Sequence, residues 1–173
     1  MARFSKFVKR AKNFLIDGIE FKVSKREIYS HHIYNITRLI IMYKGNVIVN
    51  YPQAEDRILS NQMYWYGGVC SCALTLFDAY FSKKHFEAFN FTAQELYIEF
   101  WKKKKVTQRY MYYADKPSDP DFDYFFCSGL GEKIFKIYRV TDRRVGQKYL
   151  KRLKVAESDT DILKIITDRL LLS

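Results

Sequence analysis

The stretch IYNITRLIIMYKGNVIV, residues 33–49, decides the fold class. β-Branched and aromatic residues dominate residues 33–43 and 47–49, as is typical of strands. Lys44-Gly45-Asn46 between them has the composition of a tight turn, so the stretch predicts a β-hairpin. Pro52 cannot donate to a strand ladder and therefore ends the second strand. Apolar and polar residues alternate over residues 19–24 and predict another strand before the hairpin.

Helix signals lie on both sides of this hairpin. An apolar stripe at helical spacing predicts a basic amphipathic helix within residues 1–18. Thr92-Ala93-Gln94-Glu95 is a capping box, so a helix is expected to begin there and to close at the lysines of residues 102–105. Ser158 with Asp161 is expected to begin a last helix that reaches residue 171.

The remaining apolar runs complete the expected architecture. They predict strands at residues 69–77, 106–113, 123–127 and 132–141, the first of them flanked by Gly67-Gly68. The order is then helix, about four strands, helix, three or four strands, helix. This order predicts an α+β fold with two antiparallel sheets of roughly four strands, each followed by a helix. Residues 19–173 would form a single domain behind the helix of residues 1–18.

Two blocks of sequence resemble a known family. Tyr43-Lys44-Gly45, Val47-Ile48-Val49, Pro52 and Ala54 are similar to the Tyr-Lys-Gly-Lys-Ala-Ala-Leu strand and following proline of the Whirly family. Residues 84–96, KHFEAFNFTAQEL, resemble that family's entry into its first helix. The chain departs from the family at Asn46, where the family has a second lysine. The resemblance implies a doubled ββββα fold, homo-oligomers (tetramers in the family), and binding of single-stranded DNA or RNA along the sheets.

The charge balance indicates a polyanionic partner independently of that resemblance. Thirty Lys and Arg face nineteen Asp and Glu among 173 residues, which gives a net charge of +11. Such a balance favours nucleic acid or an anionic membrane surface. Aromatic residues make up 17% of the chain, and rings together with cations suit single-stranded nucleic acid, in which bases stack on rings and cations meet phosphates. No run approaches the about 18 apolar residues of a membrane span.

Two basic tracts and one turn supply the candidate binding residues. The first tract combines cations with tyrosines that can stack on bases, and the second is rich in arginines that pair with phosphates. The candidates are Lys44 in the turn, then Lys102, Lys103, Lys104, Lys105, Arg109, Tyr110 and Tyr112, and then Arg139, Arg143, Arg144, Lys148, Lys151 and Arg152. The alternative for the second tract is a solvent-exposed basic connection that Gly146 can bend.

The sequence thus predicts a non-enzymatic protein that binds single-stranded RNA or DNA with little sequence preference, without a cofactor or metal. Two other functions stay open: a metal-dependent nuclease that uses Asp119, Asp121 or Glu20, and a basic structural or inhibitor protein that docks on an acidic partner. Three cysteines without a secretory signal indicate a reducing compartment, so the cytoplasm is the expected location, with import into an organelle as the alternative.

Overall fold

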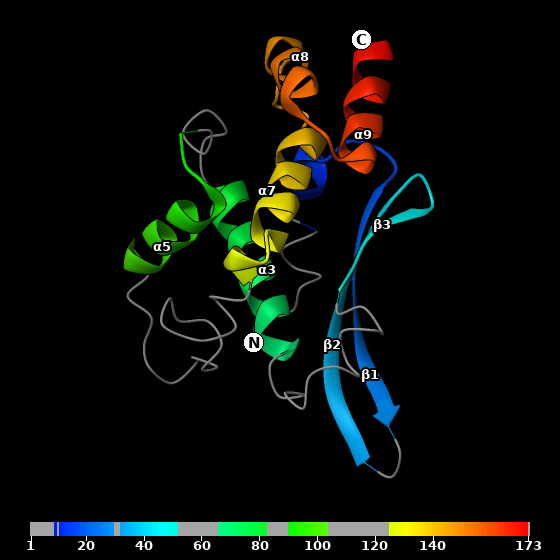
Figure 1. Cartoon of the computed structure of the whole chain (residues 1–173), viewed down its shortest axis with the longest axis vertical. Helices are drawn as coiled ribbons and strands as arrows, with labels where there is room; N and C mark the ends of the chain where they lie inside the picture. The colour runs from blue at the N-terminus through cyan, green and yellow to red at the C-terminus, as the bar shows by residue number, and fades with distance from the viewer. Residues whose placement is uncertain are drawn as a thin grey trace.

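The structure is a computed structural model that describes residues 9, 11–29, 32–51, 66–82, 90–103 and 125–172. In chain order, its elements are η1 (Lys12–Phe14), β1 (Ile19–Tyr29), β2 (His32–Tyr43), β3 (Asn46–Tyr51), α3 (Tyr66–Ser82), α5 (Ala93–Lys103), α7 (Leu130–Thr141), α8 (Gln147–Ala156) and α9 (Thr160–Leu171). Figure 1 shows the sheet along one side of the molecule, with α3 next to β2 and α5 on the side away from the sheet.

The three strands form one antiparallel sheet in the order β1-β2-β3, which confirms the predicted hairpin. Lys44 and Gly45 form the turn with φ of 49° and 81°, the left-handed region in which glycine is free of strain. Ile19 stands opposite Tyr43 and Val23 opposite Leu39, and the register shifts between Lys25 and Glu27. The far ends of β1 and β2 project beyond the helices, at the opposite end of the molecule from α8 (Figure 1).

The predicted pair of four-stranded sheets is wrong. Within the described ranges there is one three-stranded sheet, and most of the other residues are helical. Residues 69–77 belong to helix α3 and residues 132–141 to helix α7, where strands were predicted. Residues 125–127 are helical as well. The strand predicted at residues 106–113 lies outside the described residues, and so does most of the helix predicted for residues 1–18.

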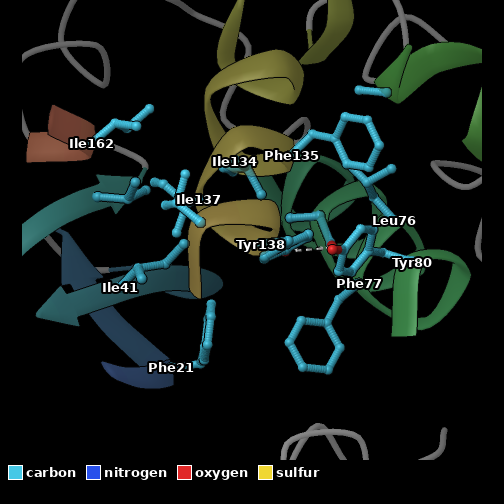
Figure 2. Close-up of a cluster of buried hydrophobic side chains, with 14 of the residues drawn as sticks. Phe21, Ile41, Leu76, Phe77, Tyr80, Ile134, Phe135, Ile137, Tyr138 and Ile162 are labelled. Carbon is cyan, nitrogen blue, oxygen red and sulfur yellow. Dashed lines mark hydrogen bonds between the residues drawn. The ribbon is translucent and has the colours of Figure 1, made fainter. Parts of the chain in front are cut away.

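The core explains why both runs are helical. Side chains from β1, β2, α3 and α7 meet around Tyr138 (Figure 2), and α3 contacts β2 as well as α7. The Phe77 ring lies 5.4 Å from Phe21 and 5.2 Å from Tyr138, in the edge-to-face arrangement that aromatic rings prefer. The Tyr138 hydroxyl donates to the carbonyl of Ala73, 2.9 Å away. Helix α3 is apolar over most of its surface, which hides the helical period, whereas α7 buries one face and keeps polar residues such as Lys133 and Lys136 on the other.

Both predicted helix starts are found, one of them with a different cap. At α5 the Thr92 amide donates to Glu95 Oε2 (2.8 Å) and the Glu95 amide donates to Thr92 Oγ1 (3.2 Å), which is the predicted capping box. Helix α9 begins at Thr160, but Asp159 caps it rather than Ser158. The Asp159 carboxylate accepts from the amides of Asp161 and Ile162.

Candidate nucleic-acid interface

Helix α8 carries the largest group of exposed cations that the second tract supplies. Leu150 is buried and Tyr149 and Leu153 are partly buried, so this stripe packs against the molecule, where α8 contacts α9. The other side faces solvent and carries four cations. We call these four residues the α8 cationic surface: Lys148, Lys151, Arg152 and Lys154.

Only part of the charge pattern of α8 stabilises the helix itself, namely Lys154 in the last turn, where the helix dipole favours a cation. No acidic residue lies between Gln147 and Ala156. Lys148 stands in the first turn, where the helix dipole disfavours a cation. Lys148 and Arg152 are four residues apart, and like charges at that spacing destabilise a helix. An anion bound outside the helix would relieve this repulsion.

The corner that positions α8 rests on a buried carboxylate. Asp142 has no exposed surface and accepts from Arg144 Nε (2.9 Å) and Nη2 (2.7 Å) and from the Tyr80 hydroxyl (3.0 Å). Burial, followed by the charge of Asp142, raises the pKa of Tyr80 far above its usual value. The Arg169 guanidinium donates to the carbonyls of Val140, Asp142 and Val145 at 2.8–3.0 Å. Residues 140–145 are therefore held firmly before α8 begins.

Two contacts hold the other end of α8. Lys136 Nζ lies 3.0 Å from Glu157 Oε2, and Lys133 Nζ lies 2.8 Å from Asp159 Oδ2. Burial alone would raise the pKa of Asp159, but the Lys133 ammonium and the amides of α9 together lower it. These ion pairs attach the connection after α8 to α7. The residues before α8 are held by Arg169 of α9 and Tyr80 of α3, so both ends of the cationic helix are fixed.

Two of the predicted binding arginines make intramolecular contacts. Arg144 pairs with Asp142, and its guanidinium lies 4.3 Å from the centre of the Phe14 ring. Arg139 donates to the carbonyl of Phe91 (2.6 Å), and its guanidinium lies 4.0 Å from the Phe135 ring centre. Both guanidinium groups are therefore engaged within the molecule, although they were predicted to have the same role as the exposed cations.

Arg143 and Lys44 are more exposed but each has an acidic partner. Arg143 forms an ion pair with Asp17, on the surface. Lys44 Nζ lies 2.7 Å from Asp168 Oδ2, which also accepts from the Tyr43 hydroxyl (3.1 Å). The hydrogen bond from Lys44 lowers the pKa of Asp168. The structure therefore places Lys44 at a contact between the hairpin turn and α9, away from a continuous cationic surface.

The first basic tract is only partly described. Lys102 and Lys103 are in the last turn of α5, and their side chains lie outside the described part of the structure. The predictions for Lys104, Lys105, Arg109, Tyr110 and Tyr112 lie outside the described residues. Described tyrosines Tyr80, Tyr97 and Tyr138 are buried and cannot stack on a base. Lys154, which belongs to the second tract but was not among the candidates, is exposed on α8; the helical spacing of Leu150 and Leu153 was the signal for it.

The residues of the nuclease alternative are only partly placed. Lys22 Nζ lies 2.9 Å from Glu20 Oε2, and both side chains are about half exposed on β1. Asp119 and Asp121 lie outside the described residues. In the part of the chain that the structure describes, no three His, Cys, Asp or Glu residues gather as a metal site would require. The same part contains no helix long and apolar enough to cross a membrane.

Comparisons with known proteins add no relative. No family model matches the chain, and neither a curated protein nor a solved structure matches it. The resemblance to the Whirly family stays a prediction from two short sequence blocks.

Proposed function

We propose that the protein binds single-stranded RNA or DNA with little sequence preference and without catalysis, and that the α8 cationic surface contacts the phosphates. One observation carries the proposal: four exposed cations share a ten-residue helix that contains no acid and is fixed at both ends. The net charge of +11 supports it, since a polyanion is attracted to the whole molecule before it reaches this surface.

The expected mechanism is electrostatic. Lysine and arginine bind phosphate oxygens without reading a base, and each neutralised phosphate releases counterions, so affinity falls steeply with salt. A ten-residue helix is about 15 Å long and can contact only a few phosphates. Stacking of bases is assigned to Tyr110 and Tyr112, as expected from the sequence, and would give single strands an advantage over duplex.

The test compares two variants that lose the same charge. Lys148→Gln/Lys151→Gln/Arg152→Gln removes three cations from α8, and Lys9→Gln/Lys12→Gln/Lys164→Gln removes three exposed cations elsewhere. Glutamine preserves helix propensity. Binding of labelled oligonucleotides is measured across a salt series. The α8 variant should flatten the slope of log K against log salt by about 2, since each contact with a single strand contributes about 0.7.

The outcomes separate the parts of the proposal. An equal loss in both variants would show that only net charge matters and would remove α8 from the interface. Duplex bound as tightly as a single strand would contradict the preference for unpaired bases. If the wild-type protein binds neither at low salt, the proposed function is wrong, and an acidic protein partner becomes the better explanation of the cationic surface.

A further inference from the structure

Strand β1 is an edge strand whose outer side has no partner strand among residues that the structure describes. The amide of Lys44 donates to the carbonyl of Gly18 (2.8 Å), and Ile19 stands opposite Tyr43. In an antiparallel ladder the direction of the backbone groups alternates. The amides and carbonyls of Glu20 and Lys22 therefore point to β2, and those of the odd-numbered residues, Ile19, Phe21 and Val23, point outward.

A hollow follows this outer edge. It has a volume of about 670 Å³ and is lined by residues 12, 13 and 15–22 together with Arg143. Residues 19–22 include both faces of β1, so the hollow lies along the edge of the strand rather than over one face. An unpaired strand edge next to open space is a template for another strand.

The charges along β1 are complementary to a second copy of the same strand. If two β1 strands run antiparallel about a twofold axis at Phe21, Glu20 of each faces Lys22 of the other. Ile19 then stands opposite Val23. Opposite charges directly across a strand pair are stabilising and like charges destabilising. An edge protected against self-association would instead place like charges opposite each other.

Backbone geometry selects the same axis. With the axis at Phe21, the outward-pointing groups of Ile19, Phe21 and Val23 meet their equivalents and can exchange hydrogen bonds. An axis at Glu20 or Lys22 would place like charges opposite each other and would bring together residues whose backbone groups already point to β2. The irregularity between Lys25 and Glu27 ends the regular part of the strand.

We propose that two copies of this protein pair through the outer edge of β1, antiparallel about Phe21, and so join two three-stranded sheets into one continuous sheet. Such a contact is isologous, as in most homodimers. It is independent of nucleic-acid binding by α8, which lies elsewhere on the chain. Glu20 and Lys22, each about half exposed, form the charge pairs of this contact.

The first experiment exchanges the charges. In nuclease-treated protein, the dissociation constant of the dimer is measured by analytical ultracentrifugation. Glu20→Lys and Lys22→Glu each place like charges opposite at two symmetric positions, which should raise the dissociation constant about tenfold. The double variant Glu20→Lys/Lys22→Glu restores the pairs and should restore the dimer. Circular dichroism confirms that each variant is folded.

The second experiment tests the register. Glu20→Cys and Lys22→Cys are made separately, each with Cys127→Ser because Cys127 is exposed. Residues opposite each other at a non-hydrogen-bonded pair have Cα atoms about 4.5 Å apart, within the reach of a disulfide. Oxidation of the mixed variants should link residue 20 to residue 22, mapped by mass spectrometry. A dimer of either variant alone should not cross-link. Its two cysteines, both at position 20 or both at position 22, lie diagonally across the strand pair, about 7–8 Å apart.

Three results would overturn the proposal. The first is a monomer at every concentration tested. The second is a dimer whose dissociation constant ignores both single charge changes. The third is a dimer that is lost on Val47→Lys, because Val47 is 53% exposed on β3 and its loss would assign the contact to the opposite edge of the sheet.

Discussion

At the scale of single residues, Asp142 connects parts of the chain that are far apart in sequence. Its carboxylate contacts Tyr80 of α3 and Arg144, and its carbonyl accepts from Arg169 of α9. Its backbone also forms a bridge to Leu15. A buried carboxylate is costly unless it is paired and hydrogen-bonded, and here every neighbour supplies a donor. The arrangement makes Asp142 a structural residue of the corner that positions α8.

Removal of this carboxylate should therefore lower stability sharply. Asp142→Ala leaves the Arg144 guanidinium without its anion and should lower the free energy of unfolding by about 3 kcal/mol. Tyr80→Phe removes one hydrogen bond and should cost about 1–2 kcal/mol. Urea unfolding followed by circular dichroism measures both. Arg143→Gln, at the exposed pair with Asp17, serves as the control and should change the value by less than about 1 kcal/mol.

At the scale of elements, the hairpin and two helix starts could be predicted and the central helices could not. Turn and capping signals are local, so residues 44–46 and 92–95 specify their structure directly. Helix α3 has no such local signal. Its buried residues Cys72, Leu76 and Tyr80 repeat at helical spacing, but the predicted strand ended at residue 77 and so left Tyr80 out of the pattern. In α7, β-branched residues favour a strand, and burial of Ile134, Ile137 and Tyr138 along one face overrides that preference.

In the candidate site, too, features set by local sequence could be predicted and features set by tertiary contacts could not. The exposure of Lys148, Lys151 and Arg152 is a consequence of helix α8, which the sequence interpretation treated as a connection bent at Gly146. Once the period of Leu150 and Leu153 is recognised, those cations fall on the solvent side. The roles of Arg139 and Arg144 could not be predicted, because their partners Phe91 and Asp142 are fixed by tertiary contacts and, for Asp142, by its burial.

Helix α7 also makes a prediction at this scale. A Cβ atom on Gly131 would lie 2.8 Å from Phe126 Cδ1 and 3.1 Å from Phe125 Cε1. Gly131→Ala should therefore lower the free energy of unfolding by about 1–2 kcal/mol through overpacking, although alanine favours helix by about 1 kcal/mol. Thermal and urea unfolding measure the change. Gly146→Ala, which has open space around it, should be milder; equal effects would argue against the close packing at Gly131.

At the scale of the whole molecule, the acidic residues that hold α9 make the free energy of unfolding depend on pH. Hydrogen bonds lower the pKa of Asp168, chiefly from Lys44. Burial would raise the pKa of Glu157 and of Asp159, but their hydrogen bonds and lysine partners lower both. A carboxylate whose pKa is lower in the folded state stabilises that state above its unfolded pKa, about 3.9 for Asp and 4.3 for Glu. Its contribution is lost as the pH falls through the folded pKa.

The contribution of these carboxylates to the free energy of unfolding should thus stay nearly constant between pH 7 and about pH 5, and it should decrease below about pH 4. Urea titrations at several pH values test this. Asp159→Asn keeps a side-chain oxygen as a helix cap but removes the titrating group, so its stability should decline less steeply with acid. A slope identical to that of the wild-type protein would show that Asp159 does not contribute to the acid response.

Contacts between the first and last parts of the described chain also bear on how the protein folds during synthesis. Leu15 bridges to Asp142, and Tyr43 and Lys44 bond to Asp168. Chains grow from the N-terminus at about 5–20 residues per second. The early hairpin must therefore wait for several seconds on the ribosome, with the part of its apolar face that α3 does not cover exposed, until α7 and α9 emerge. During that interval this apolar surface is open to contacts with other chains.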